Sequence, residues 1–255
     1  MRVFAPAKLT VSLSVTGVRA DGYHELDAEL VTVSLADELV FDDGRSGLTV
    51  EGEEWTRATA LPAAADNLVT RALAATGRTA AVRLTKRIPL GAGLGGGSAD
   101  AAAVLRWAGE KDPEVASRLG ADVPFCVTGG RARVQGVGER VTPLAFEARD
   151  YLLVLPPFGV DTAAAYRAWD ARPSQEGPNH LAVAALSAEP RLAHWRDALG
   201  DLTGREPCLA GSGSSWFVEG WSPEAGTGAM PELRAGGERG RLVRARTVPA
   251  DWDGT

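Results

Sequence analysis

A glycine-rich segment constrains the fold and function of this chain more than any other stretch. Residues 89–100 read Pro-Leu-Gly-Ala-Gly-Leu-Gly-Gly-Gly-Ser-Ala-Asp, after a strand pattern over 80–87 and at the start of a helix pattern over 98–109. Successive glycines let backbone N–H groups converge on a ligand, and a helix N-terminus adds partial positive charge. Five glycines within 91–97 exceed what a tight turn needs. The segment therefore predicts a phosphate cradle, in which Ser98 either caps the helix or holds a phosphate-bound metal ion.

The phosphate loops of several other protein classes do not fit this segment. Gly91, Gly93 and Gly96 match the G-x-G-x-x-G spacing, but a dinucleotide fold carries an acidic residue about 20 positions later, at the end of the next strand. Glu110 and Asp112 stand near that distance here, yet they follow a helix. The chain contains neither the Gly-Lys pair of a Walker A loop nor the His-Arg-Asp and Asp-Phe-Gly signatures of protein kinases.

Composition places the chain among ordinary globular proteins. Its 255 residues, 45% hydrophobic and 24% charged, suffice for one large domain or two modest ones. A net charge of −6 argues against nonspecific nucleic-acid binding. No stretch approaches the ~18 apolar residues of a membrane span. Because there is no apolar leader and the two cysteines, Cys126 and Cys208, are far apart, we expect a cytoplasmic protein with reduced thiols and no membrane partner.

Hydrophobic periodicity and turn residues predict a mixed α and β fold. Strands are expected at 3–15, 28–35, 39–41, 80–87, 123–127, 132–137, 151–155, 208–210 and 216–218. Helices are expected at 67–76, 98–109, 113–120, 162–170, 181–186 and 191–199. Asp66 should cap the first helix, and 222–240 should form a loop with a short helix. A boundary before the strand at Tyr151 divides the chain into domains 1–147 and 148–255.

Four ordered motifs resemble those of the GHMP kinases, the superfamily of galactokinase, homoserine kinase and mevalonate kinase. The glycine-rich segment resembles their central motif, and Ala-Pro-Ala-Lys-Leu at 5–9 resembles their N-terminal one. Arg-Ala-Asp-Gly-Tyr-His at 19–24 resembles the substrate turn of one family, the 4-diphosphocytidyl-2-C-methyl-D-erythritol kinases. Leu-Gly-Ala-Asp-Val-Pro-Phe at 119–125, with Gly-Val-Gly-Glu at 136–139, resembles that family's catalytic segment. The resemblance is dense over 3–142 and thin afterwards.

The resemblance implies a fold and an activity. It implies an α+β, two-lobed GHMP kinase fold, with a ribosomal-protein-like N-terminal lobe and a ferredoxin-like C-terminal lobe. The implied reaction is ATP-dependent phosphorylation of the 2-hydroxyl of a cytidyl diphosphate sugar-alcohol in non-mevalonate isoprenoid precursor synthesis, with Mg²⁺ on the ATP. The partners would be small molecules only, and the protein a monomer or homodimer. The alternatives are a homoserine- or mevalonate-type kinase, which the turn at 19–24 disfavours, and a catalytically silent binding protein.

The resemblance also implies roles for individual residues. Asp122 would be the base that accepts the substrate proton, and Lys8 would keep that carboxylate ionised; from the sequence alone, these are equally a turn aspartate and an edge lysine. Tyr23 and His24 would stack on and hydrogen-bond to cytosine, with Thr10 as a further substrate contact; loop packing is the alternative for the aromatic pair. Ser98 would reach the metal ion through the ATP phosphates. The implied ATP-binding residues are Asn67, Pro89, Leu90, Gly91, Ala92, Gly93, Leu94, Gly95, Gly96, Gly97, Ser98 and Ala99.

Some positions depart from the family pattern. Thr10 stands where an asparagine is usual, His180 where an aspartate is usual, and Trp216 adds bulk after a second glycine turn. That turn, Ser-Gly-Ser at 212–214, resembles the family's third motif, which closes over the phosphates. The aromatic residue expected on the other face of the cytosine is missing from its usual place. Tyr166 and Trp169 are candidates to replace it.

Overall fold

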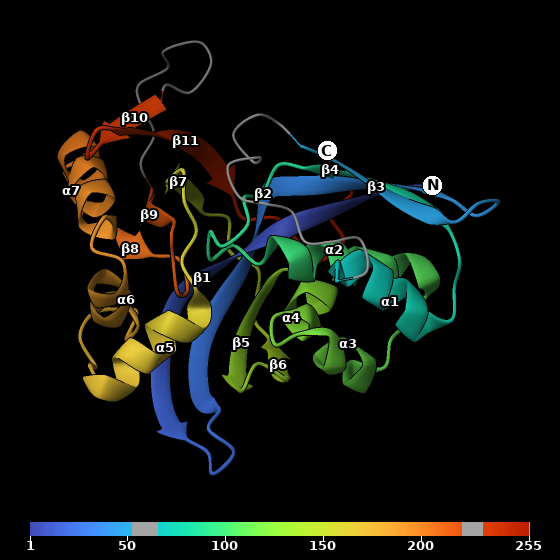
Figure 1. The fold of residues 1–255 in the computed structure, drawn as a ribbon, viewed down its shortest axis with the longest axis horizontal. Helices are drawn as coiled ribbons and strands as arrows, with labels where there is room; N and C mark the ends of the chain where they lie inside the picture. The colour runs from blue at the N-terminus through green and yellow to red at the C-terminus, as the bar shows by residue number, and fades with distance from the viewer. Residues whose placement is uncertain (53–65, 221–231, 255) are drawn as a thin grey trace.

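The computed structural model describes residues 1–52, 66–220 and 232–254, and these residues contain two β-sheets (Figure 1). The six-stranded sheet has the order β3-β4-β2-β5-β6, with β1 paired to β2. Its strands are β1 (Arg2–Val18), β2 (His24–Asp42), β3 (Gly47–Gly52), β4 (Ala81–Lys86), β5 (Arg131–Gly136) and β6 (Arg140–Pro143). The five-stranded sheet has the order β10-β11-β7-β9-β8. Its strands are β7 (Asp150–Leu155), β8 (Cys208–Leu209), β9 (Trp216–Glu219), β10 (Glu232–Ala235) and β11 (Glu238–Arg246).

The first sheet is built around a long antiparallel hairpin of β1 and β2. Pairing runs from Arg2 opposite Val40 to Val18 opposite His24, and the register shifts at three places, one of them just after Pro6. The proline therefore bends β1 without ending it, because a bulge absorbs the missing N–H. Strand β2 is also continuous, although separate strands were expected at 28–35 and 39–41. It pairs with β1 along one edge and with β4 and β5 along the other.

Four helices gather on one side of the first sheet: α1 (Leu68–Thr76), α2 (Gly96–Ala108), α3 (Pro113–Leu119) and α4 (Val123–Thr128) (Figure 1). The central helix is α2, whose residues 99–105 are all buried. Its run of alanines lets the neighbouring elements pack closely. The cap of α1 differs from the prediction: the Asn67 side chain, not Asp66, accepts a 2.9 Å hydrogen bond from the Val69 N–H.

The strand predicted at 123–127 is wrong, because these residues form helix α4. The Cys126 N–H donates to the Asp122 carbonyl at 3.0 Å, and the Gly129 N–H donates to the Phe125 carbonyl at 2.7 Å. The valine and phenylalanine side chains favour a strand locally. Pro124 has the fixed φ that suits the first turn of a helix, and burial of the turn against α2 decides the outcome.

The second sheet is covered on both faces. Helices α5 (Thr162–Ala171), α6 (Ala182–Ala188) and α7 (Leu192–Thr203) lie beside it (Figure 1). Alternate residues of the central strand β7 face two clusters: Leu152 packs with Trp195 of α7, whereas Leu153 packs with Leu9 and Val31 of the β1–β2 hairpin. A hydrophobic layer therefore joins the two sheets.

The C-terminal part of the chain gives one more correction. Residues 232–246 form the β10–β11 hairpin, where 222–240 was expected to be a loop with a short helix; the stretch 222–231 lies outside the described residues. After β11 the chain returns to the first sheet, where the Val248 N–H donates to the Thr32 carbonyl at 2.9 Å. Across the described ranges, the helices lack the length and apolar character needed to cross a membrane.

Candidate active site

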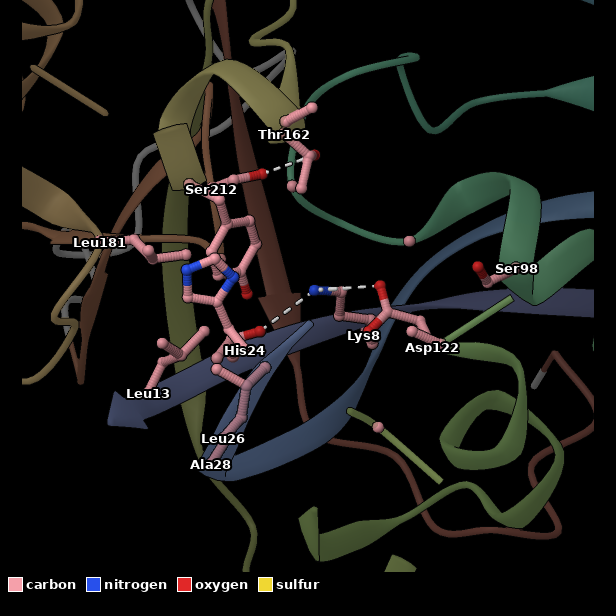
Figure 2. Close-up of a pocket in the computed structure, with 18 of the residues that line it drawn as sticks. Lys8, Leu13, His24, Leu26, Ala28, Ser98, Asp122, Thr162, Leu181 and Ser212 are labelled. Carbon is pink, nitrogen blue, oxygen red and sulfur yellow. Dashed lines mark hydrogen bonds and ion pairs between the residues drawn. The ribbon is translucent and has the colours of Figure 1, made fainter. Parts of the chain in front are cut away.

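One cavity of about 790 Å³ lies where the glycine-rich loop, the β1–β2 hairpin and α5 meet (Figure 2). Most residues singled out from the sequence line it: Lys8, Thr10, Tyr23, His24, Pro89, Leu90, Gly91, Ala92, Gly93, Gly95, Gly96, Gly97, Ser98 and Asp122. Among the described residues, Asn67, Leu94 and Ala99 were also expected to bind ATP but do not line this cavity. Asn67 caps α1, next to the lining residue Leu68, and the other two are packed in the core.

Lys8 and Asp122 meet in this cavity although they lie far apart in the sequence. The Lys8 Nζ is 3.4 Å from the Asp122 Oδ2, and the lysine side chain is 8% exposed whereas the aspartate is 39% exposed. The Lys8 Nζ also donates to the Thr10 Oγ1 at 3.1 Å. Asp122 stands at the cap position of α4, but within the described part of the chain its side chain makes no capping hydrogen bond. Its carboxylate thus remains available to a ligand, and the departure at Thr10 supplies an acceptor for the ammonium.

The glycine loop packs directly on Lys8. The Lys8 N–H donates to the Leu94 carbonyl at 3.1 Å. Gly95 has a φ of +66°, and a Cβ at this position would lie 2.7 Å from the Lys8 Cγ. Only glycine combines this backbone conformation with so close an approach. The loop and the lysine therefore hold each other in place at the mouth of the phosphate cradle.

The second glycine turn docks on the first through the backbone. The Ser214 N–H donates to the Gly91 carbonyl at 3.0 Å, and the Ser215 N–H donates to the Ala92 carbonyl at 3.1 Å. At Gly93 a Cβ would lie 1.9 Å from the Ala210 carbonyl oxygen. Segments from the two sheets are therefore in backbone contact at the cavity, and Ser212 of the turn lines it.

Asn179 holds this second turn, a role that the sequence analysis missed. Its side-chain amide donates to the carbonyls of Leu209 at 2.9 Å and Gly211 at 2.7 Å, and its Oδ1 accepts from the Leu181 N–H. The signal was weak: Asn179 is one of two asparagines in the chain. Its neighbour His180 accepts a hydrogen bond from the Val15 N–H through Nδ1, which ties this segment to β1.

Ser98 lies in the first turn of α2 and does not cap it. The helix begins at Gly96, and its cap residue is Gly95. Gly96, Gly97 and Ser98 line the cavity (Figure 2 shows Ser98 at its edge), so the first turn of α2 borders the cavity, an arrangement that fits an anionic ligand. In the described residues no cluster of three or more His, Cys, Asp or Glu could hold a metal ion.

The opposite end of the cavity is aromatic. The His24 Nε2 is 2.7 Å from the Asp170 Oδ1, and the His24 ring lies 4.5 Å from Tyr166 and 5.6 Å from Trp169. Tyr166 lines the cavity. Trp169 does not: it is buried, packs edge-on against the His24 ring and donates through Nε1 to a backbone carbonyl. Burial, and then the charge of Asp122, raise the pKa of Tyr166, so this phenol stays neutral. Tyr23 is 64% exposed at the rim.

The two ends flank the lysine–aspartate pair. In Figure 2, Lys8 and Asp122 lie between His24 and Ser98. The Thr162 and Ser212 hydroxyls share a 2.9 Å hydrogen bond on the cavity wall. Trp216 is only 2% exposed and packs in the core cluster that contains Leu152 and Trp195, away from the cavity lining. Its bulk therefore belongs to the core of the second sheet.

Several kinases are similar in sequence to this chain over most of its length. Residues 63–130 match the family model described as GHMP kinases N terminal domain. The 4-diphosphocytidyl-2-C-methyl-D-erythritol kinase of Ruegeria pomeroyi is 37% identical over 92% of this chain and 93% of that protein. The kinase of the same name from Thermus thermophilus is 38% identical over 93% of this chain and 94% of that protein.

Solved structures agree with these relatives. A crystal structure of 4-(cytidine 5'-diphospho)-2C-methyl-D-erythritol kinase superposes with a TM-score of 0.68 at 38% identity, covering 85% of this chain and 89% of that one. A mevalonate kinase shares the fold alone, with a TM-score of 0.57 at 11% identity over 98% of this chain and 99% of that one. The predicted α+β GHMP kinase fold and small-molecule kinase class are confirmed, and the homoserine and mevalonate alternatives are not favoured. The chain belongs to the 4-diphosphocytidyl-2-C-methyl-D-erythritol kinase family.

Proposed function

We propose that this protein transfers the γ-phosphoryl group of ATP to the 2-hydroxyl of 4-diphosphocytidyl-2-C-methyl-D-erythritol, in non-mevalonate isoprenoid precursor synthesis. The observation that carries the proposal is the Lys8–Asp122 pair, with 3.4 Å between Nζ and Oδ2, placed between a glycine cradle and an aromatic end of one cavity. We place the reaction in the cytoplasm, as the two free cysteines favour. The protein would act as a monomer or homodimer.

Asp122 and Lys8 would prepare the acceptor hydroxyl. The half-exposed Asp122 carboxylate is open to the cavity, so it can accept the hydroxyl proton and orient the oxygen. Phosphoryl transfer passes through a loose transition state, in which positioning and charge neutralisation matter more than early proton removal. The Lys8 ammonium donates to the Thr10 hydroxyl, and its aliphatic side chain packs against Gly95, so it would keep the carboxylate in place and offset the charge on the incoming phosphoryl group.

The glycine loop would hold the phosphates of ATP. The first turn of α2, which carries Ser98, borders the cavity, and the N–H groups of a helix N-terminus suit an anionic ligand. When bound to those phosphates, Mg²⁺ would supply further neutralisation of charge, and the Ser98 hydroxyl would be the side-chain group that holds it. Leu68, next to Asn67, which the resemblance implied as an ATP-binding residue, would contact the nucleotide.

The aromatic end would bind the cytidine of the acceptor. Tyr23 offers a ring at the rim, and His24, fixed by Asp170, offers a polar edge to the base. Tyr166 is the aromatic side chain placed to complete the base site, because it lines the cavity beside His24.

The cavity would be shared by two lobes. We propose residues 1–147 as the N-terminal lobe, with the cradle and the Lys8–Asp122 pair, and 148–255 as the C-terminal lobe. The change of sheet between β6 and β7 supports this division. The hydrophobic layer between the sheets and the return of 247–254 to the first sheet tie the lobes together.

The proposed reaction is tested by following ADP release with ATP, Mg²⁺ and a panel of alcohols. The panel holds 4-diphosphocytidyl-2-C-methyl-D-erythritol, homoserine and mevalonate. We expect release with the cytidyl substrate only, and loss of it in Gly96→Val, whose branched side chain would collide with Ile88 behind the phosphate cradle and displace the first turn of α2. Release with homoserine or mevalonate alone would reassign the acceptor. No release with any alcohol from a protein that binds ATP would overturn the proposed activity.

A further inference from the structure

Behind the glycine loop lies a cluster of three buried charged side chains that the proposed mechanism does not use. The Lys86 Nζ donates to the Asp100 Oδ2 at 2.7 Å and also to the Asp37 Oδ2. The three side chains are between 0% and 3% exposed. They come from three elements: Asp37 from β2, Lys86 from β4 and Asp100 from α2.

The cluster joins the two ends of the glycine loop. Lys86 is the last residue of β4, where the loop begins, and Asp100 lies in the second turn of α2, just after the loop ends. The Asp37 Oδ1 accepts hydrogen bonds from the backbone N–H groups of Arg87 and, at 2.8 Å, of Ile88. One carboxylate thus fixes the entrance of the loop, and one ammonium links that carboxylate to the helix at its exit.

The cluster also touches the cradle itself. Gly96 is the first residue of α2 and lines the cavity. A Cβ at Gly96 would lie 3.2 Å from the Lys86 Nζ and 2.9 Å from the Ile88 Cγ2. The backbone that would meet a phosphate therefore rests directly on Lys86, and a small shift of the lysine would move the first turn of α2.

Stability alone is a weak reason for such a cluster. Burying charges costs desolvation free energy, and well-packed apolar side chains of similar volume are often as stabilising as a buried ion pair. Within the described part of the chain, the Asp100 Oδ1 has no hydrogen-bond partner, which adds to the cost. What the charges do provide is fixed geometry, because each hydrogen bond sets the distance between two elements.

We propose that Asp37, Lys86 and Asp100 are positioning residues that set the width of the glycine loop, and with it the affinity for the ATP phosphates. This proposal rests on the assignment of the loop to ATP. The three residues touch neither ligand: they act through the backbone of residues 87–96, between the end of β4 and the first turn of α2.

The main test uses a charge-balanced variant, Lys86→Met/Asp100→Leu. It removes one charge of each sign and leaves Asp37 with its two backbone donors. Asp100→Asn is the second variant, since it keeps the shape of the side chain and lowers the chance of misfolding. Val82→Ala is the matched control, because this buried β4 residue packs in the core and lies outside the loop and the cavity lining. ATP binding is measured by calorimetry, KM for ATP and for the acceptor by ADP release, and folding by thermal unfolding.

We expect both charge variants to lose ATP affinity by about tenfold to a hundredfold, the range typical of a misplaced binding group. The KM for ATP should rise in step, while the KM for the acceptor should stay within about twofold, and Val82→Ala should lose stability without losing ATP affinity. A folded charge variant with ATP affinity within about twofold of wild type overturns the proposal. If the balanced variant does not fold, Asp100→Asn decides by the same criterion. If wild type itself does not bind ATP, the proposed function fails first, which separates the two failures.

Discussion

The Lys8–Asp122 pair gives the sharpest prediction for a single residue. Asp122→Asn keeps the shape and loses the charge, and a positioned general base contributes about 10²–10⁴-fold. Turnover, followed as ADP release, should therefore fall by at least ~10². The side chain is 39% exposed, so the thermal midpoint should stay close to that of wild type. Asp197→Asn, on the exposed face of α7, is the control. Full activity in Asp122→Asn would remove this residue from the chemistry.

Tyr23 is the second prediction for a single residue. If its ring stacks on cytosine, Tyr23→Ala should cost about 1–3 kcal/mol of acceptor binding, the usual range for a base on an aromatic ring. That corresponds to an affinity loss of roughly five- to 150-fold. Tyr23 is 64% exposed, so its packing in the folded protein is slight and Tyr23→Ala should change stability little, unlike what the loop-packing alternative predicts. Separate calorimetric titrations with the acceptor and with ATP should show the loss for the acceptor only.

Phe146→Ala serves as the control for Tyr23→Ala, since Phe146 is also an exposed aromatic residue, at 48%, and does not line the cavity. It should leave both affinities unchanged. An acceptor affinity equal to wild type in Tyr23→Ala would shift the stacking role to Tyr166, the other aromatic side chain beside His24 at this end of the cavity.

Between elements, the docking of the two glycine turns gives a third prediction. Gly93→Ala would put a Cβ 1.9 Å from the Ala210 carbonyl oxygen, so the two turns must separate. Gly77→Ala is a matched control: both glycines have positive φ, +76° and +63°, but at Gly77 no atom of the described chain lies within 4 Å of the added Cβ. Both variants lose the backbone freedom of glycine, about 1–2 kcal/mol.

Only Gly93→Ala should lose ATP affinity, as measured by calorimetry, because only that variant displaces backbone that lines the cavity. Thermal unfolding should show a larger loss of stability in Gly93→Ala than in Gly77→Ala. Equal behaviour of the two variants in both measurements would mean that the turns do not depend on each other.

At the scale of the whole molecule, two kinds of contact join the sheets. The hydrophobic layer between them contains residues of β1, β2, β7, β9 and β11. A partly buried ion-pair network adds to it: the Arg149 Nη1 lies 3.6 Å from Glu29 of β2 and 3.7 Å from Glu219 of β9. Because these pairs are few and long, and the area of buried apolar surface is large, the apolar layer carries most of the association between the sheets.

The stability of the whole molecule should depend on pH through Asp100. Burial raises the pKa of Asp100 to about 7; the Lys86 charge opposes this shift and the Asp37 charge adds to it. The folded state therefore keeps a proton that the unfolded state releases from about pH 4, near the ordinary aspartate pKa. The contribution of this group to stability is present at low pH and is lost as the pH rises towards 7. The Asp100→Asn variant lacks this group.

Denaturant titrations of wild type and Asp100→Asn at pH 5 and pH 8 check the sign. The free energy of unfolding of wild type, relative to the variant, should be higher at pH 5 than at pH 8 by about 2–3 kcal/mol, since roughly two pH units separate pH 5 from the folded pKa of about 7 and each corresponds to ~1.4 kcal/mol. A constant difference between the two proteins would mean that Asp100 has the same protonation in the folded and unfolded states.

Local sequence alone determined the elements whose signals are local. The glycine run between a strand and a helix, the helix that begins at Pro113, and the apolar strand at 151–155 are all present as predicted. Period and turn chemistry suffice for them, because each depends on contacts within a few residues. The motif resemblance identified the family, and Lys8, Asp122 and His24 do line one cavity.

Tertiary structure decided everything that depends on distant residues meeting. Residues 123–128 became a helix because α2 packs on them, and β2 became one strand because partners lie on both its edges. Tyr166 came to lie beside His24, and Asp37 and Asp100 on Lys86, through sheet register and helix packing. A sequence pattern shows which face of an element is apolar, but not which element covers it. The set of residues that lines the cavity was therefore decided by the tertiary fold.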